Sequence, residues 1–357
     1  MNRAFWRDRR VLVTGHTGFK GGWLSLWLQT LGAKVSGFAL PPPTRPSFFD
    51  VCRVAEGMES GFADLRDPQQ VQAAARNADP EIVLHLAAQP LVRQSYADPV
   101  ETYATNVMGT VHLLEAVRKL PAVRAVVVVT SDKCYENREW VWGYRENEPM
   151  GGFDPYGSSK GCVELVTAAY RNSFFHPSRH PEHHVAIATA RAGNVVGGGD
   201  WAADRLVPDC LRAIDGGTPL RLRFPDAVRP WQHVLDPLAG YLTLAERLHV
   251  EGTDFAEAWN FGPSDEDVQP VRWVVEQLIH GCGSHMSWEL EPSPQPHEAN
   301  NLRLDCAKAR SRLGWRARWP LPVALEKVCV WHKAFGSGAN MRDRTLAQIG
   351  DFEAAFR

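Results

Sequence analysis

The chain has 357 residues, of which 44% are hydrophobic and 22% are charged, and its 39 basic and 41 acidic residues leave a formal charge of −2. At about 150 residues per domain, this length predicts two domains or one large domain with an inserted lobe. The composition is that of a folded globule. The near-neutral charge argues against a nucleic-acid-binding protein, which would carry a basic excess.

The sequence carries no signal for a membrane or for secretion. No apolar run approaches the roughly 18 residues of a membrane span, and the charged residues 1–10 lack the apolar stretch of a secretory signal. Seven Cys residues without a CxxC pair match neither a disulfide framework nor a zinc site. We therefore expect a cytoplasmic protein without a membrane or nucleic-acid partner and without a metal, even at the cluster of His176, His180, His183 and His184.

Strand-like and helical segments alternate along the first half of the chain. A helix follows the first predicted strand and ends near Gly32, and Asp67 and Pro68 mark the start of another helix. A long helix spans about 99–119. The predicted strands are residues 11–14, 35–40, a third that ends at 62–64, 82–86, 125–129 and 185–190. The near-continuous apolar runs at 82–86 and 125–129 are typical of parallel strands covered on both faces.

The fold class that this pattern predicts is α/β, a Rossmann-type doubly wound parallel sheet with a smaller mixed α/β substrate lobe. We assign residues 1–192 to the sheet domain, which also carries the catalytic residues. Beyond Gly193 the regular alternation of strands and helices gives way to glycines, prolines and short mixed segments. Residues 193–340 are predicted to form the substrate lobe, partly interwoven with the first domain, and residues 341–357 a helical tail.

The glycines between the first strand and the first helix indicate a nucleotide-binding turn. Gly15 permits the tight turn, Gly18 lets the backbone approach a pyrophosphate, and Gly21 lets the helix pack on the strand. Many other strand–helix turns also use glycine, but here the strand and helix context favours a dinucleotide. Asp64, at the end of the third strand, could accept a hydrogen bond from an adenine amino group or simply form a turn.

The identity of the dinucleotide is less firmly indicated. An acidic residue about 20 positions beyond the glycines normally binds the ribose of NAD. Residues 38–41 contain no acid there, and Arg45 is nearby. We predict NAD, and the sequence leaves NADP as the alternative.

Tyr156 and Lys160 lie at positions i and i+4, so that they share one face of a predicted helix. A Lys ammonium beside a phenol favours the phenolate, which makes Tyr156 a candidate base for a sugar hydroxyl, with Ser131 sharing the hydrogen bond. The pattern Tyr-x-x-x-Lys is common by chance and could instead mark an exposed helix. Asn106 is a candidate for bending a helix near this site, or an ordinary surface residue.

Asp132 and Lys133 follow Ser131 at the carboxyl end of the fifth strand, where open α/β sheets bind ligands. Hydroxyl oxidation alone needs only the Ser, Tyr and Lys, so these two residues are candidates for a second acid/base pair. A solvated Asp–Lys turn is the alternative.

In the second half of the chain, a set of residues suits diphosphate recognition, although each alone is more often a surface ion-pair former: Arg191, Asn194, Arg205, Arg221, Arg229 and His297.

The glycine turn and the Ser131, Tyr156 and Lys160 set resemble the extended short-chain dehydrogenase/reductases of the NAD-dependent epimerase/dehydratase type. Within them, four segments resemble the CDP-glucose 4,6-dehydratase family: residues 130–137 (TSDKCYEN), 191–201 (RAGNVVGGGDW), 229–234 (RPWQHV) and 313–315 (LGW). The resemblance runs from about residue 11 to residue 331. Glycine stands at position 157, where the family more usually has serine.

The resemblance implies a hydro-lyase that converts CDP-D-glucose into CDP-4-dehydro-6-deoxy-D-glucose and water. Tyr156, assisted by Ser131 and Lys160, would take the proton of the sugar 4-OH while bound NAD oxidises C4. Lys133 would then remove the C5 proton and Asp132 would protonate the departing 6-OH, before hydride returns to C6. The family usually forms homodimers, and its products feed deoxysugars such as those of lipopolysaccharide O-antigen.

Residue by residue, these considerations assign two sets of contacts. The cofactor set is Gly15, Thr17, Gly18, Phe19, Lys20, Gly21, Asp64, Leu65, Leu86, Ala87, Ala88, Asn106, Tyr156 and Lys160. The substrate set, for CDP-glucose, is Gln89, Arg93, Asn194, Arg205, Leu206, Arg221, Arg229 and His297.

Two other functions stay open from the sequence. A nucleotide-sugar 4-epimerase would need Ser131, Tyr156 and Lys160 but has no use for an acid/base pair at Asp132 and Lys133. A non-catalytic NAD-binding sensor would give no reason for the complete Ser, Tyr and Lys set.

Overall fold

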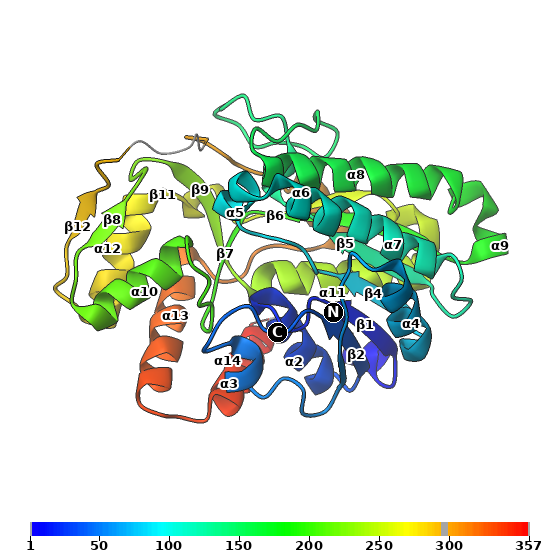
Figure 1. Ribbon diagram of the computed structural model, residues 1–357, viewed down its shortest axis with the longest axis horizontal. Helices are drawn as coiled ribbons and strands as arrows, with labels where there is room; N and C mark the ends of the chain where they lie inside the picture. The colour runs from blue at the N-terminus through cyan, green and yellow to red at the C-terminus, as the bar shows by residue number, and fades with distance from the viewer. Residues whose placement is uncertain (1, 294–298, 356–357) are drawn as a thin grey trace.

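A sheet of parallel strands forms the centre of the computed structural model, which describes residues 2–293 and 299–355 (Figure 1). The sheet has seven strands in the order β10-β6-β5-β4-β1-β2-β3. From β1 the chain first builds outward through β2 and β3 and then returns to build the other half, which is the doubly wound arrangement. The predicted fold class is confirmed. The strands are β1 Arg10–Thr14, β2 Lys34–Ala39, β3 Glu59–Phe62, β4 Ile82–His85, β5 Ala125–Val129, β6 Ala186–Ala192 and β10 Ala258–Phe261.

Helices cover both faces of this sheet, and for this reason its inner strands are apolar throughout. Val11 and Val13 pack in a core with α2 (Phe19–Thr30) and α11 (Leu235–Glu251). Leu12, between them, points to the opposite face and packs in a second core with α4 (Pro68–Ala78), α7 (Gly109–Val117) and α8 (Pro155–Ser173). Successive side chains of a strand point to opposite faces, so a strand buried on both sides needs apolar residues at every position.

The helix signals in the sequence are confirmed. The Asp67 carboxylate accepts hydrogen bonds from the backbone N–H groups of Gln69 (2.8 Å) and Gln70 (3.2 Å), and Pro68 opens α4. Gly32 follows the end of α2 with φ +81°. The predicted helix at 99–119 consists of three consecutive segments, which are α6 (Pro99–Tyr103), a π-helical turn η1 (Ala104–Met108) and α7.

The seventh strand, β10, was not predicted. It comes from the second half of the chain and pairs in parallel with β6, with Ala258 opposite Thr189 and Phe261 opposite Ala192. Its four residues, Ala-Trp-Asn-Phe, contain no β-branched residue and no clear alternation. Tertiary pairing, rather than local propensity, makes this segment a strand.

The second lobe has its own small core between short strands and three helices. A three-stranded sheet, β11-β9-β7, and a two-stranded sheet, β12-β8, pack with these helices. The elements are β7 Asn194–Val196, α10 Leu206–Gly216, β8 Leu220–Leu222, β9 Val228–His233, β11 Val268–Pro270, α12 Val271–Cys282, β12 Trp288–Leu290 and α13 Leu321–Gly336.

The C-terminal helix α14 (Met341–Ala354) packs against α2, at the opposite end of the sequence (Figure 1). Trp27 donates a hydrogen bond from its indole to the Glu353 carboxylate (2.8 Å), and its ring contacts that of Phe352 edge-on. Segments after residue 192 thus contribute a strand and two helices to the sheet domain. The division at residues 192 and 340 remains a prediction from the sequence.

The remaining helical segments are short: α1 Arg3–Trp6, α3 Phe48–Val51, α5 Val92–Ala97, η2 Asp132–Cys134, η3 Pro177–Arg179, α9 His180–His183, η4 Gly252–Phe255, η5 Asp265–Asp267 and η6 Ala309–Leu313. Over residues 2–293 and 299–355, no helix is both long enough and apolar enough to cross a membrane. The same residues contain no grouping of three or more His, Cys, Asp or Glu side chains suited to a metal ion.

Candidate active site

A cleft of about 1210 Å³ opens at the carboxyl ends of the central strands and is lined by residues of both lobes. Most of the predicted site residues meet there. They are Gly15, Thr17, Gly18, Phe19, Lys20, Gly21, Asp64, Leu65, Leu86, Ala87, Ala88, Arg93, Ser131, Asp132, Lys133, Tyr156, Lys160, Asn194, Arg205, Leu206, Arg221 and Arg229. Gln89 and Asn106 are not among the described residues that line the cleft, and His297 lies outside the described residues.

The glycine turn at the start of α2 needs its glycines for two different reasons. Gly15 has φ +77°, and a Cβ there would meet the backbone of Ala87 at 2.8 Å. A Cβ on Gly21 would lie 2.1 Å from the carbonyl oxygen of Gly15. Around Gly18 the nearest atom to an added Cβ is the Gly15 oxygen at 3.4 Å, and Gly18 lines the cleft. The roles inferred for Gly15 and Gly21 thus have a direct steric cause.

These residues fit a dinucleotide. Gly18 is the N-cap of α2 and supplies no capping side chain, so the first N–H groups of the helix and its positive dipole end face the cleft. Such an end suits a pyrophosphate. Just beyond β3, the Asp64 carboxylate accepts from the Arg66 N–H (2.9 Å) and pairs with its guanidinium (2.6 Å), and the hydrogen bonding to Arg66 lowers the pKa of Asp64.

Among the described residues, the wall of the cleft beyond β2 contains no carboxylate that could bind the ribose of NAD, and for this reason the sequence left NADP as an alternative. Leu40, Pro41 and Arg45 line the cleft here, and the Thr17 hydroxyl donates to the Leu40 carbonyl oxygen (2.9 Å), which ties this loop to the glycine turn. The segment presents apolar groups and one guanidinium, with no carboxylate at its end.

Tyr156 and Lys160 both lie on α8, one helical turn apart. The Asp154 carboxylate caps this helix by accepting from the Gly157 N–H (2.8 Å), and Pro155 opens it. Lys160 donates from Nζ to the Val129 carbonyl oxygen at the end of β5 (3.2 Å). Burial lowers the pKa of Lys160 to about 8 and raises the pKa of Tyr156 to about 12. The Ser131 hydroxyl and the Arg205 guanidinium oppose the rise at Tyr156.

Asp132 combines burial with an available oxygen. Its Oδ1 accepts a hydrogen bond from the Ser131 hydroxyl (2.9 Å), whereas its buried Oδ2 has no hydrogen-bond partner among the described residues. Burial raises the pKa of this carboxyl, and the cations of Lys133 and Arg229 oppose the rise. The raised pKa favours the protonated form of this carboxyl, which can act as a proton donor.

Asn106 connects elements behind the cleft. It lies in the π-helical turn η1, as expected for a residue that bends its helix. Its Nδ2 donates to the Gln89 carbonyl oxygen (3.1 Å) and to the Ser159 hydroxyl (2.8 Å), and Ser159 donates onward to the Tyr156 carbonyl oxygen (2.7 Å). The Gln89 side chain bonds to Leu91 and to Thr102. In this structure Gln89 and Asn106 therefore act as supports of the wall.

A second buried chain of hydrogen bonds supports the loop after β4. The Thr14 hydroxyl accepts from the N–H groups of Leu86 (3.2 Å) and Ala87 (3.1 Å), so it donates to His85 Nδ1 (2.7 Å). His85 Nε2 is then the protonated nitrogen and donates to Thr110 (3.1 Å). Burial lowers the pKa of His85 to about 3, which keeps the ring neutral.

The arginines of the second group occupy different environments. Arg205 pairs with Asp200 (2.8 Å), and Arg229 is buried near Asp132. Arg93 pairs with Asp204 (3.0 Å), and Arg221 pairs with Glu289 (3.0 Å) at the exposed rim. Asn194 opens β7 at the floor of the second lobe.

Arg191 does not belong to this group, and its assignment to diphosphate recognition is wrong. It points away from the cleft into the space under α8, where it pairs with the buried Glu164 (2.8 Å). Sequence reasoning missed Glu164, although its position one turn beyond Lys160 was a visible signal. It also missed Asp200, whose pairing with Arg205 depends on the fold.

Gly157 is required by packing. A Cβ at this position would lie 2.8 Å from the Lys133 carbonyl oxygen and 3.1 Å from Gly152 Cα. The first turn of α8 therefore touches the backbone of the loop that carries Asp132 and Lys133.

Comparison with known proteins shows the family to which the chain belongs. A family model described as GDP-mannose 4,6 dehydratase matches residues 12–328. A CDP-glucose 4,6-dehydratase of Salmonella typhimurium is 54% identical over 355 residues, which cover 99% of each chain. A dTDP-glucose 4,6-dehydratase of Streptomyces antibioticus is 26% identical over 274 residues, 76% of this chain and 75% of the relative.

Solved structures share the fold at lower identity. A UDP-glucose 4-epimerase of Thermotoga maritima, determined with UDP-glucose, has a TM-score of 0.79 at 22% identity and covers 91% of this chain and 99% of its own. A dTDP-glucose 4,6-dehydratase of Bacillus anthracis in complex with NAD has a TM-score of 0.75 at 21% identity, with 92% and 98% covered. The predicted resemblance to the CDP-glucose 4,6-dehydratases is confirmed, and the chain belongs to the family that the GDP-mannose 4,6 dehydratase model describes.

Proposed function

We propose that the protein is a CDP-glucose 4,6-dehydratase, a hydro-lyase that converts CDP-D-glucose into CDP-4-dehydro-6-deoxy-D-glucose and water. The observation that carries this proposal is the meeting of Ser131, Asp132 and Lys133 with Tyr156 and Lys160 in one cleft beside the glycine turn. The relative with this activity is identical at 54% of positions over nearly the whole chain. It supports cytosine as the base of the sugar nucleotide.

The cofactor in this proposal is NAD. Gly15, Gly18 and the uncapped end of α2 would hold its pyrophosphate, with Asp64 and Leu65 at the adenine end and Leu86–Ala88 along its length. Bound NAD would supply the reversible hydride acceptor that this redox-neutral reaction needs, so that no external oxidant would be consumed.

Tyr156 takes the proton of the sugar 4-OH. Burial holds its pKa at about 12 despite the Ser131 hydroxyl and the Arg205 guanidinium, both of which favour the phenolate that this step requires. Lys160, anchored on the Val129 carbonyl oxygen, keeps an ammonium on the same helix face.

Asp132 and Lys133 carry out the elimination. The 4-ketone acidifies the C5–H bond; Lys133 removes that proton, while Asp132 donates a proton from Oδ2 to the departing 6-OH, which leaves as water. The raised pKa of Asp132 favours the acid form that this step requires.

The second lobe recognises the CDP moiety. Asn194, Arg205, Leu206 and Arg229 line the inner part of the cleft, where guanidinium groups can pair with the diphosphate, and Arg93 and Arg221 stand nearer its rim. His297 is retained as a predicted contact. The product would then feed the synthesis of a deoxysugar, such as one of lipopolysaccharide O-antigen.

The assembly is a homodimer in this proposal. Val100 on α6 and Leu165 on α8 are 77% and 62% exposed, and these two helices lie against each other. Such apolar side chains on adjacent helices suit pairing with the same face of a second copy.

A cytoplasmic location is supported by the seven Cys residues, all of which are free thiols, as expected for a reducing compartment.

The test is to incubate the purified protein with CDP-glucose, with and without added NAD, and to measure the 4-keto-6-deoxy sugar by its absorbance in alkali. UDP-glucose and dTDP-glucose are run in parallel. Keto sugar from CDP-glucose alone is the expected result. Appearance of a galactose nucleotide without any keto sugar would reject the roles of Asp132 and Lys133 and favour an epimerase.

A further inference from the structure

Beneath the cleft lies a buried ion pair that the proposed reaction does not use. The Glu164 carboxylate on α8 pairs with the Arg191 guanidinium on β6 at 2.8 Å, and the two side chains are only 5% and 4% exposed. Glu164 also accepts hydrogen bonds from the hydroxyl groups of Thr130 (2.5 Å) and Thr189 (2.7 Å). A buried pair of this kind is costly to desolvate, and a hydrophobic pair would often serve stability as well.

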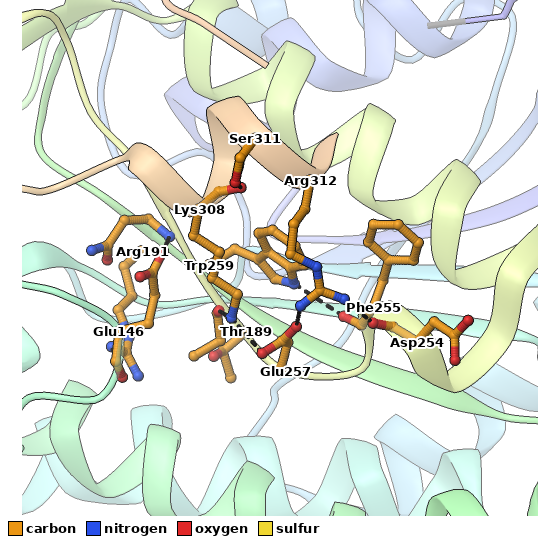
Figure 2. Close-up of polar contacts among 12 residues, drawn as sticks. Glu146, Thr189, Arg191, Asp254, Phe255, Glu257, Trp259, Lys308, Ser311 and Arg312 are labelled. Atoms are coloured by element: carbon orange, nitrogen blue, oxygen red, sulfur yellow. Dashed lines mark hydrogen bonds and ion pairs between the residues drawn. The ribbon is translucent and has the colours of Figure 1, made fainter. Parts of the chain in front are cut away.

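Arg191 extends the pair towards the loop after β5. It donates to the Tyr135 hydroxyl (2.6 Å) and to the Glu146 carbonyl oxygen (3.0 Å), and its guanidinium stacks over the Tyr135 ring. Figure 2 shows Arg191 beside Glu146, next to the edge strand β10. Tyr135 in turn donates to Asn260 of β10 (2.7 Å).

The pair therefore contacts both segments that carry the reacting groups. Thr130 immediately precedes Ser131, and Tyr135 closes the turn that holds Asp132 and Lys133. Glu164 itself lies one helical turn beyond Lys160 on α8. A shift of the pair would move these two segments relative to each other.

We propose that Glu164 and Arg191 are positioning residues, which hold Lys160 in register with Ser131 and whose opposite charges balance each other at the Lys160 ammonium. The catalytic consequence of this balance rests on the proposed function. The electrostatic part concerns this chain's own residues and can be measured without substrate.

The surroundings of Lys160 leave Glu164 as the main source of negative charge. Burial lowers the pKa of Lys160 to about 8, and the Glu164 carboxylate is the largest influence in the opposite direction, followed by Cys134. Burial raises the pKa of the Cys134 thiol well above its usual value, so it stays neutral. His85 is neutral as well, and Lys20 adds a repelling cation from α2.

Opposite effects are expected when either charge is removed. Glu164→Gln leaves the Arg191 cation unopposed, so Lys160 loses its proton at a lower pH. Arg191→Gln removes the guanidinium that pairs with Glu164 and leaves the carboxylate to the remaining cations, Arg171 and Lys160, so Lys160 keeps its proton to a higher pH. We expect displacements of about one pH unit in each direction, a tenfold change in protonation, and a double variant close to the parent.

The experiment measures the protonation of Lys160 directly. The full chain is treated with a trace of acetic anhydride between pH 6.5 and 10, and acetylation of Lys160 is followed by peptide mass spectrometry, because only the neutral amine reacts. The pH dependence of kcat/KM for CDP-glucose is recorded alongside. If the parent enzyme makes no keto sugar, the proposed function fails, yet the labelling curves still decide the role of the pair.

Glu257→Gln is the matched control. Glu257, immediately before β10, pairs with Lys308 (2.5 Å) and with Arg312 in the cluster around Trp259 that Figure 2 shows, and it is not one of the groups that act on the pKa of Lys160. This variant should leave the Lys160 curve unchanged. The proposal would be overturned if the Lys160 acetylation curves of both single variants moved in the same direction relative to the parent, or if neither curve moved.

Folding is checked by circular dichroism and thermal unfolding. If either single variant fails to fold, Glu164→Asp, which keeps the charge but shortens the arm, takes its place. It should lower kcat without displacing the Lys160 curve, and a displaced curve with unchanged kcat would contradict the positioning role.

Discussion

The side-chain amide of Asn106 donates a hydrogen bond of 2.8 Å to the hydroxyl of Ser159, which lies between Tyr156 and Lys160 on α8. The same amide holds the Gln89 backbone through both of its polar atoms. One residue in a π-helical turn thus links the loop after β4 to the helix that carries the proposed base.

Asn106→Asp should uncouple these elements. A carboxylate cannot donate to Ser159 or to the Gln89 carbonyl oxygen, and burial of an unpaired charge adds a penalty. We expect the free energy of unfolding to fall by about 1–3 kcal/mol or more and kcat/KM to fall at least tenfold. Urea denaturation and initial rates measure the two effects. Asn340→Asp, at the N-cap of α14 far from the cleft, is the control.

Asp132→Asn should stop the elimination and leave ligand binding intact. The amide keeps a group that can accept from the Ser131 hydroxyl, but it cannot supply the proton from Oδ2. We expect keto-sugar formation to fall by roughly 100-fold or more, the usual contribution of a general acid. Calorimetry of CDP-glucose binding should give an unchanged affinity. Normal turnover of this variant would instead favour an epimerase.

Gly157→Ala should disturb the loop opposite the first turn of α8. The added Cβ would lie 2.8 Å from the Lys133 carbonyl oxygen, which is backbone and cannot swing aside. We expect a drop in kcat with little change in CDP-glucose affinity, since the nucleotide contacts lie elsewhere. Gly217→Ala, where nothing lies within 4 Å but φ is +60°, controls for the general cost of replacing a glycine.

The protein should lose stability in mild acid. Burial lowers the pKa of His85 and His233 to about 3 and of His16 to about 4. Because the folded-state values lie below the unfolded value of 6.5, this stability is present above pH 6.5 and is lost as the pH falls towards 4. Three protons correspond to a slope of up to about 4 kcal/mol per pH unit.

Urea denaturation at pH 7.5, 6.5, 5.5 and 5.0 tests this dependence. His85→Gln should reduce the slope by about a third, whereas His176→Gln, at an exposed position, should not change it. A slope that His85→Gln leaves intact would contradict the assignment of a neutral His85.

Leu165→Lys tests the proposed dimer. A charge on this exposed face of α8 should yield a monomer by sedimentation, while the same change at Val250, also exposed but distant in the fold, should not. A parent protein that sediments as a monomer would reject the dimer at once.

The sequence by itself determined the features that depend on local chemistry. Runs of apolar residues marked five of the central strands, Asp67 and Pro68 marked a helix start, and the glycine turn and the Ser, Tyr and Lys set marked the site. These signals could be interpreted because each arises from sterics or hydrogen bonding within a few residues.

Only the tertiary structure decided the features that join distant segments. The short β10 is a strand because β6 lies beside it, and Arg191 faces Glu164 rather than the cleft because its strand packs under α8. The Lys160 ammonium binds the Val129 carbonyl oxygen, a contact that no spacing reveals. Burial and electrostatic fields are sums over the whole fold, so the side that a side chain faces and the proton that it holds follow from packing and not from the order of residues.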